Sequence, residues 1–481
     1  MLKENKILLI LILGMMMGSI DTTIILLALP TIAQDLNANL SLSIWAIVVY
    51  LLIVAVATTQ LGRLGDLFGR SRLFNLGFAV FTLGSALCGF APSMIFLIFS
   101  RAVQAVGGSL LEANSGAIIA DTFEPNQRGK AYGFLSMSWT VGAMVGIVLG
   151  GVLTTFLGWR FIFYINLPIG IIGLIYSKRY LEDRTLVKED MDLAGMALLA
   201  LALSLISFGL IDYVGIGIRA ANLLLIAAGI LLIPIFLLWE SRSKAPIVHI
   251  NTFKHSVLRS SLLASFFQSM GYLSLAFLMT LYLQGVRGLD PFDAAMLMVP
   301  GYILSSLLAP FMGGLSDKFG ARIIATAGIA LMCVTVLLYM TLGVSTPLYI
   351  VVLASLFAGL GSSMFWPANN SAVMAYASAD RHGSTSGLLR TMANIGTLCS
   401  YVISITAAST FMPRATAFSI FLGTTRLAGG LSPAFLGGLH AAFALSLLIL
   451  IIAGLFSLVR GKEDRSAKTW KMDAMEARSS K

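Results

Sequence analysis

Apolar windows long enough to cross a lipid bilayer recur along nearly the whole chain, and they constrain its fold more than any other feature. The hydrocarbon core of a membrane is about 30 Å thick, so one helix needs about 20 mostly apolar residues to cross it. The windows lack the alternating pattern of barrel strands, and only helices then satisfy the backbone polar groups in lipid. We expect fourteen spans, at residues 7–30, 43–62, 73–91, 94–121, 131–156, 161–181, 192–213, 220–239, 257–285, 292–315, 322–342, 347–377, 384–411 and 435–459.

Composition and charge support a membrane protein. Of the 481 residues, 58% are hydrophobic and only 11% are charged, against about 25% charged residues in soluble domains. A net charge of +10 would also suit a nucleic-acid partner, so the position of each basic residue matters. With a cytoplasmic N-terminus, 25 of the 32 Lys and Arg residues fall on the cytoplasmic side and two, Arg101 and Arg390, lie deep inside spans. The outer loops hold five: Arg160, Arg219, Arg287, Arg414 and Arg426.

This distribution follows the positive-inside rule, which places both termini in the cytoplasm of a multi-pass cell-membrane protein. No nucleic-acid partner is expected, and the basic tail is interpreted as a solvated cytoplasmic end. Cys88, Cys333 and Cys399 fall inside predicted spans, so no disulfide framework is expected.

Two loops repeat one another. "GRLGDLFGRSR" (residues 62–72) follows the second span, and "GGLSDKFGARI" (residues 313–323) follows the tenth. The offset is 313 − 62 = 251 residues, and it covers eight spans where two joined six-helix halves would give six. The matching pairs are Gly62 with Gly313, Leu64 with Leu315, Asp66 with Asp317, Phe68 with Phe319 and Gly69 with Gly320.

The repeat predicts an all-α membrane protein built from two pseudo-symmetric six-helix bundles with two inserted linker helices. We expect an N-terminal bundle at residues 1–185, the linker helices at 186–250, a C-terminal bundle at 251–460 and a cytoplasmic tail at 461–481. Many secondary transporters are built from repeated bundles that rock around a central cavity.

The repeated loops are candidates for conformational control. Glycine permits their tight turns, and Asp66 and Asp317 are placed to accept hydrogen bonds at a neighbouring helix start. Arg70 or Arg72 is expected to pair with Asp121 at the end of the fourth span. Such contacts would hold one state and break in the other, and the alternative is a plain basic loop at the membrane surface. The candidate set at these loops is completed by Gly62, Gly313 and Arg322.

Charges inside the membrane mark the candidate coupling site. Asp21 lies about 21 Å along its helix from the cytoplasmic end, nearly the depth of Arg101, so the two can be neighbours. An arginine this deep needs an acid or a wet cavity. Along the fourth span Arg101, Gln104, Gly108 and Glu112 share one helical face, which we expect to line the cavity. Burial and a neighbouring cation act oppositely on a carboxyl group, so Asp21 is expected to exchange a proton when its surroundings change. A static ion pair is the alternative.

The C-terminal half offers polar residues for a substrate cavity. They are Gln268, Tyr272, Trp366, Asn369, Asn370, Arg390 and Asn394. Polar side chains at these positions either contact a substrate or join transmembrane helices to one another. Glu112 matches Arg390 in depth, and we expect the two to approach one another across the cavity in one state. Glu112 is either a second proton or substrate site or a structural hydrogen-bonding group.

The fifth span carries closely spaced glycines that permit close helix approach. We interpret them as a sliding interface between the two halves rather than as a ligand site. The set comprises Gly133, Gly142, Gly146, Gly150 and Gly151.

These motifs together resemble the major facilitator superfamily, and within it the fourteen-helix drug:proton antiporter family. The resemblance is carried by the two repeated loops, by "DTTIILLALP" in the first span, by "RAVQAVGG" and "GWRFIFYINLPIG", and by the glycine spacing of the fifth span. It covers the N-terminal half densely and the C-terminal half thinly. Ile147 departs from the family pattern, which has proline there, and Glu112 stands in a region where the family is usually apolar.

The resemblance implies a proton-coupled antiporter that exports lipophilic, cationic or neutral small molecules, with the first-helix acid Asp21 implicated in coupling. The alternative is a proton-linked or facilitative importer of one organic solute on the same fold. An enzyme or sensor would need a metal cluster, nucleophile or soluble domain that the sequence lacks. We therefore expect no enzyme activity, no cofactor and a monomer whose partners are protons, a small molecule and the bilayer.

Overall fold

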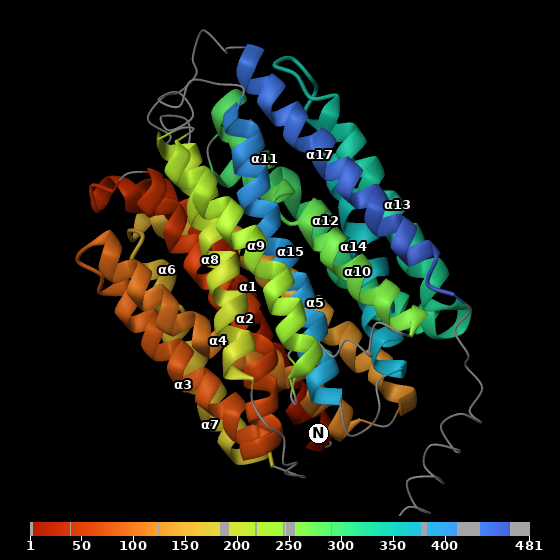
Figure 1. The fold of residues 1–481 in the computed structure, drawn as a ribbon. Helices are drawn as coiled ribbons and strands as arrows, with labels where there is room; N and C mark the ends of the chain where they lie inside the picture. The colour runs from red at the N-terminus through yellow and green to blue at the C-terminus, as the bar shows by residue number, and fades with distance from the viewer. Residues whose placement is uncertain are drawn as a thin grey trace, which may run out of the picture.

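The computed structural model describes residues 3–38, 40–123, 125–182, 192–216, 219–243, 246, 255–289, 291–376, 382–410 and 433–461. Within these ranges the regular secondary structure is entirely helical. Figure 1 shows the helices as a bundle of long, roughly parallel rods. The expected all-α membrane fold is confirmed.

The first seven helices form what we call the N-terminal half. They are α1 (Lys3–Asp35), α2 (Leu40–Phe68), α3 (Arg70–Gly89), α4 (Met94–Thr122), α5 (Pro125–Phe156), α6 (Phe161–Tyr164) and α7 (Asn166–Tyr180). Two helices follow, α8 (Leu193–Ile216) and α9 (Ala220–Arg242).

The remaining helices form the C-terminal half. They are α10 (Ser256–Tyr272), α11 (Leu275–Thr280), the π-helical segment η2 (Leu281–Val286), α12 (Pro291–Phe319), α13 (Ala321–Met340), α14 (Tyr349–Ala375), α15 (His382–Thr410) and α17 (Pro433–Leu458).

The helices coincide with the expected spans. Among the described residues, thirteen helices are long and apolar enough to cross a membrane, with α6 and α7 together forming one and α10 and α11 another. The thirteenth expected span, 384–411, coincides with α15, which is outside that set of helices and carries Arg390, Asn394 and several hydroxyl groups. This helix packs between α2 and α10, so protein rather than lipid surrounds its polar face.

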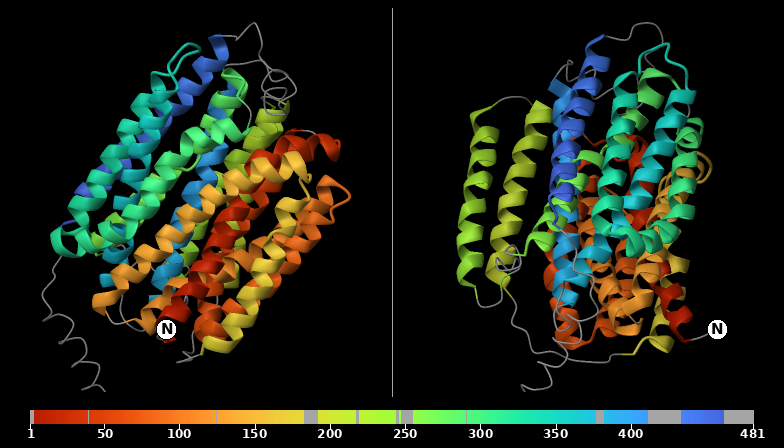
Figure 2. Two further views of the ribbon diagram at one scale, coloured as in Figure 1. Left: turned by 180° about the vertical axis from the view of Figure 1, so that it is seen from behind. Right: turned by 90° about the vertical axis from the view of Figure 1, so that its right-hand side faces the viewer.

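Helices α8 and α9 stand at the edge of the bundle. Figure 2 shows the pair beside the rest of the molecule, and α8 packs against α2 of the N-terminal half and α15 of the C-terminal half. The outer helix α9 presents exposed leucines, Leu223, Leu224, Leu231 and Leu238. An exposed apolar face on a helix of this length is suited to lipid.

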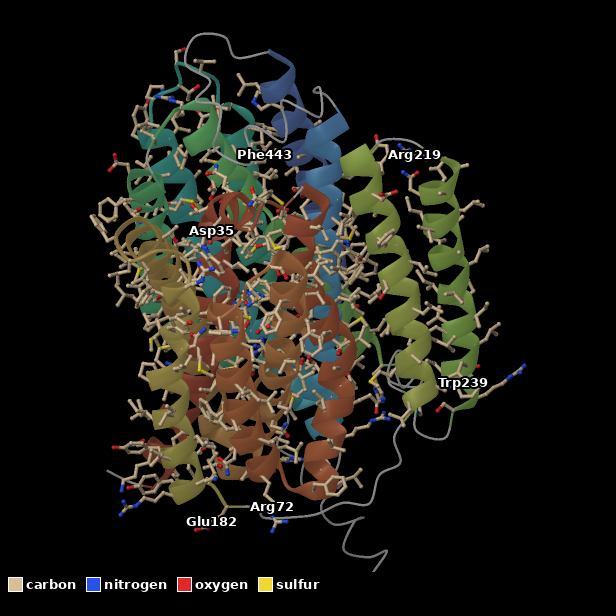
Figure 3. All side chains as sticks on the ribbon, turned by 90° about the vertical axis from the view of Figure 1, so that its left-hand side faces the viewer. Asp35, Arg72, Glu182, Arg219, Trp239 and Phe443 are labelled. Atoms are coloured by element: carbon tan, nitrogen blue, oxygen red, sulfur yellow. The ribbon has the colours of Figure 1, made fainter. Side chains whose placement is uncertain are left out.

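Polar contacts hold the two ends of the N-terminal half, where Figure 3 labels Glu182 and Asp35. At one end the Ser71 hydroxyl donates to the Glu182 carbonyl over 3.0 Å. At the other end Asp35 accepts from the Trp159 indole at 2.8 Å and from the Arg160 guanidinium at 3.0 Å. These two hydrogen bonds lower the pKa of Asp35 below its ordinary 3.8, and they tie the end of α1 to the turn before α6.

The sequence repeat is also a repeat of backbone geometry. Gly69 and Gly320 immediately precede α3 and α13, and both have φ of 105°. The Gly69 amide donates to the Gly65 carbonyl at 2.9 Å, and the Gly320 amide donates to the Ser316 carbonyl at 3.0 Å. Residues with a Cβ rarely adopt this conformation, so glycine at both positions reflects one turn used twice.

The glycines of α5 do not have the expected location. Gly142 faces Met16 and Ser19, and Gly146 faces Ile20 and Thr23, all on α1 of the same half. Gly150 likewise faces Ile24 of α1, and Gly151 is buried in the same helix. The expectation of a sliding interface between the halves is therefore wrong for Gly142, Gly146 and Gly150. These small residues instead let α1 and α5 pack tightly within one half.

Gly133 lies between the halves. A Cβ there would lie 2.8 Å from the Pro310 Cα of α12. The close approach of α5 to α12 at this point leaves no room for a side chain.

A similar contact between α12 and α14 gives a stability prediction. A Cβ at Gly301 would lie 2.0 Å from the Ser355 carbonyl oxygen, whereas a Cβ at Gly314 on the same helix would meet nothing within 4 Å. We expect Gly301→Ala to lower the free energy of unfolding by about 1–3 kcal/mol through overpacking. Thermal unfolding in detergent measures the effect, with Gly314→Ala as the matched control. Equal melting temperatures for the two variants would contradict this packing.

Candidate functional site

A cavity of about 260 Å³ lies between the two halves. It is lined by side chains of α1, α2, α4 and α5 on one side and of α10 to α15 on the other. Its walls combine apolar residues and hydroxyl groups with an aromatic set: Tyr50, Trp139, Tyr272, Tyr302, Tyr339, Trp366 and Tyr401. This is the composition of a site for an organic molecule, because aromatic surfaces bind it and a few polar groups orient it.

Six residues expected at the cavity or its coupling site do line it. They are Glu112, Tyr272, Trp366, Asn370, Arg390 and Asn394. They come from α4, α10, α14 and α15, so the cavity takes its polar groups from both halves.

Glu112 and Arg390 meet across the cavity, and this expectation is confirmed. A guanidinium nitrogen of Arg390 lies 3.7 Å from Glu112 Oε1. The Asn394 amide donates to Glu112 Oε2 at 3.2 Å. Asn394 is one helical turn beyond Arg390, so one face of α15 holds both groups toward the acid on α4. This acid–base contact joins α4 of the N-terminal half to α15 of the C-terminal half.

Asp21 and Arg101 are neighbours, as their depths predicted. They form a salt bridge in which both side chains are at most 1% exposed. Asp21 Oδ1 also accepts from the Gln104 amide at 2.7 Å and from the Asn166 amide at 3.2 Å. The acid is thus held by groups from α4 and α7, and we call these four residues with Ser85 the Asp21 cluster.

The Arg101 guanidinium also has several hydrogen-bond partners. It donates from Nε to the Ala46 carbonyl at 3.2 Å and from a terminal nitrogen to Gln104 Oε1 at 2.6 Å. Its guanidinium lies over the Tyr50 ring, 4.4 Å from the centroid. Ser85 completes the cluster by accepting from Gln104 at 2.7 Å.

The expectation that this face of α4 lines the cavity is therefore only half right. Gly108 and Glu112 line the cavity, whereas Arg101 and Gln104 do not. Gln104 instead donates to Asp21 on α1 and to Ser85 on α3, so this part of α4 faces other helices of the N-terminal half. The placement of Gln104 in the substrate cavity was wrong.

Two further cavity expectations were wrong because the side chains have protein partners elsewhere. Gln268 is fully buried and donates to the Met332 sulfur at 3.4 Å. Asn369 donates to the Ser261 carbonyl at 3.2 Å, and its own oxygen accepts from Arg460. Both residues join helices within the C-terminal half.

The halves touch on one side of the Glu112–Arg390 pair. The hydroxyls of Thr59 on α2 and Thr391 on α15 hydrogen-bond at 2.6 Å. One turn beyond Glu112, a Cβ at Gly116 would lie 2.5 Å from the Ser386 hydroxyl. The cavity is therefore closed toward the end of the bundle that carries the α2–α3 loop.

The α2–α3 loop carries the expected ion pairs. Arg70 donates to Asp66 at 2.6 Å and to Asp121, at the end of α4, at 2.6 Å. Arg72 is exposed on α3, and Arg322 occupies the second position of α13. The Asp317 side chain lies outside the described residues, while Gly62 and Gly313 are buried near the ends of α2 and α12. A role of these residues in conformational change stays a prediction.

Three contributors to the site were missed from the sequence. Asn166 stands alone as an amide in the apolar run "FIFYINLPIG", and this isolated polarity was the available signal. Tyr50 and Trp139 carried no such signal, since aromatic residues are ordinary in membrane helices.

The arrangement defines a polytopic membrane protein with a central organic-molecule cavity between two helical halves. Sequence comparison gives the family: the profile described as Major Facilitator Superfamily matches residues 11–190 and again 191–401. The chain belongs to this superfamily of transporters, and it is a transporter rather than a member of an enzyme family.

Named relatives transport several kinds of compound. The riboflavin transporter RibZ of Clostridioides difficile is 32% identical over 404 residues, covering 82% of this chain and 86% of the relative. The multidrug transporter protein MdtP of Bacillus subtilis is 31% identical over 364 residues, covering 74% and 66% respectively. The tetracenomycin C resistance and export protein of Streptomyces glaucescens is 28% identical over 402 residues, covering 82% and 74%.

Solved structures share the fold. The human organic anion transporter MFSD10 (TETRAN) has a TM-score of 0.66 at 14% identity and covers 94% of this chain and 99% of its own. The proton:xylose symporter XylE has a TM-score of 0.66 at 14% identity and covers 94% of each chain. The named drug exporters confirm the resemblance to the drug-efflux branch of the superfamily.

The Asp21 cluster gives a second stability prediction. Arg101→Ala leaves a buried carboxylate without its cation, and such a loss costs about 3–5 kcal/mol. The double variant Asp21→Asn/Arg101→Gln removes both charges and is expected to recover most of that free energy of unfolding. Arg160→Ala, which breaks a half-exposed pair with Asp35, serves as the control and should cost under about 1 kcal/mol. Denaturant unfolding in detergent measures all three, and similar losses for Arg101→Ala and Arg160→Ala would refute the argument.

Proposed function

We propose that this protein is a proton-coupled antiporter that exports lipophilic, cationic or neutral small molecules by alternating access. The observation that carries the proposal is the Glu112–Arg390 contact, an acid–base pair inside the cavity with one member on each half. A pair that spans two moving bodies can close in one state and open in the other.

Chemistry in the cavity supports an amphipathic substrate. Aromatic side chains from both halves supply apolar contact area, while Glu112 offers an acceptor to a cationic or hydrogen-bond-donating group. The drug-export names among the relatives agree with this class of substrate.

Protons and substrate would compete for the same acids. A protonated Glu112 loses its attraction for a cation, and by linkage a bound cation must favour release of that proton. We assign the second proton site to Asp21, which is ion-paired and buried in this conformation. One charge crossing 100 mV is worth about 2.3 kcal/mol, or roughly fortyfold accumulation for each net proton.

The membrane placement follows from the same proposal. We place the end of the bundle with the α2–α3 loop, and with it both termini, in the cytoplasm of a monomer in the cell membrane, because basic residues collect there. The cavity would then be closed toward the cytoplasm by the Thr59–Thr391 contact. We also propose that α8 and α9 are the linker pair (186–250), inserted between bundles at 1–185 and 251–460.

A second candidate is a proton-linked or facilitative importer of a specific organic solute. It is favoured by the similarity to a riboflavin transporter over 82% of this chain. Ile147, which lines the cavity where the antiporter pattern has proline, agrees with it.

Transport in liposomes separates the two functions. Purified protein under an imposed pH gradient is offered a fluorescent lipophilic cation or riboflavin, with wild type compared with Asp21→Asn and Glu112→Gln. Export predicts cation movement against the proton flux, lost in either variant, because each removes a proton-binding carboxyl group. Riboflavin movement with the protons would establish the importer, and uphill pumping at full strength by Asp21→Asn would refute coupling through Asp21.

The pair across the cavity has its own test. Glu112→Arg and Arg390→Glu each place like charges face to face, which we expect to reduce transport at least tenfold, about 1.4 kcal/mol of lost interaction. The double swap restores the opposite charges and should regain part of the activity. A double variant no more active than either single variant would show that the contact itself is unimportant.

A further inference from the structure

Tyr50 lies between the central cavity and the Asp21 cluster. Tyr50 lines the cavity, whereas Asp21, Arg101 and Gln104 do not. On its other side the ring covers the Arg101 guanidinium at 4.4 Å. Tyr50 thus borders both the substrate space and the buried ion pair.

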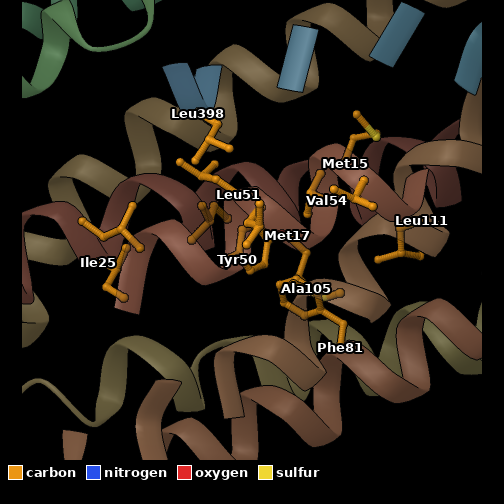
Figure 4. Packing of buried hydrophobic residues seen from close by; sticks show 14 of the residues in the cluster. Met15, Met17, Ile25, Tyr50, Leu51, Val54, Phe81, Ala105, Leu111 and Leu398 are labelled. Carbon is orange, nitrogen blue, oxygen red and sulfur yellow. The ribbon is translucent and has the colours of Figure 1, made fainter. Parts of the chain in front are cut away.

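Packing holds Tyr50 in place. Its hydroxyl rests against Gly108, where an added Cβ would lie only 2.5 Å from that oxygen. Its ring belongs to a packed apolar cluster that also contains Met17 and Ala105 (Figure 4). Only 5% of the residue is exposed.

Helix α2 binds Arg101 as well as covering it. Ala46, one turn before Tyr50, accepts from Arg101 Nε through its carbonyl at 3.2 Å. The same helix carries Thr59, which closes the halves against Thr391. Movement of α2 would therefore disturb the cover over Arg101 and the closure between the halves together.

We propose that Tyr50 is the gate between the cavity and the Asp21 cluster, and that its displacement by a cavity occupant or by α2 admits water to the ion pair. Tyr50 is a positioning residue, since it acts through Arg101 on Asp21. The inference rests on the proposed function only for the statement that the admitted water carries protons.

A native thiol reports on the gate without any transport assay. Cys88 is buried with its sulfur 3.7 Å from Gln104 Oε1, at the rim of the cluster. The chain has three cysteines, so Cys333→Ser/Cys399→Ser leaves Cys88 alone for reaction with methyl methanethiosulfonate, followed by mass spectrometry.

The expected rates of the Cys88 reaction depend on whether the aromatic ring at position 50 still covers Arg101. Removal of the ring that covers Arg101 should admit the reagent and raise the reaction rate at Cys88 at least tenfold in Tyr50→Ala, a change of about 1.4 kcal/mol. Tyr50→Leu should raise it as well, and it provides a second variant if the alanine form does not fold. Tyr50→Phe keeps the ring and should match the parent. Tyr401→Ala removes the same side chain from the opposite cavity wall and should also match it.

Proton leak then connects the gate to coupling. In liposomes without substrate, Tyr50→Ala should pass protons down a pH gradient, and adding Asp21→Asn should stop the leak. A raised Cys88 rate without leak would support the gate and refute proton carriage by Asp21. Unchanged Cys88 rates in both Tyr50→Ala and Tyr50→Leu, or an equal rise in Tyr401→Ala, would overturn the gate.

Discussion

The requirement that a charge inside a membrane have partners organises the N-terminal half of this protein. Arg101 and Asp21 are buried and bind one another, each also bonds a side-chain amide, Arg101 donates to a backbone carbonyl, and the Ser85 hydroxyl accepts from the amide of Gln104. These partners come from α1, α2, α3, α4 and α7, so one ion pair fixes the mutual positions of five helices. Such a network stabilises only while it is complete, because an unpaired charge at this depth is costly.

The acid–base pair in the cavity has the opposite character. Glu112 and Arg390 are 3.7 Å apart and line open space, with one residue on each half. A longer contact between two separate bodies is weaker and easier to break than the closed network around Asp21. The protein thus contains one ion pair suited to holding a bundle together and another suited to sensing what occupies the cavity.

Much of this was predictable from the sequence, for a physical reason in each case. The hydrophobic windows gave all fourteen helices because lipid leaves the backbone no alternative. Depth along a helix correctly paired Asp21 with Arg101 and Glu112 with Arg390, since rise per residue is constant. Gln104, Gln268 and Asn369 were misplaced because a polar side chain in a helix has the same sequence signal whether it faces a cavity or a neighbouring helix.

The sequence by itself determined the helices, the repeated turn at Gly69 and Gly320, and the depth of each buried charge, because these depend on local composition and helix geometry. Only the tertiary structure decided which face of each helix meets which neighbour. It placed Gly142, Gly146 and Gly150 of α5 against α1 instead of the opposite half, buried Asp21 away from the cavity, and set Tyr50 between the two. Those outcomes depend on helix rotation and on contacts between residues far apart in the chain, about which a single sequence carries little information.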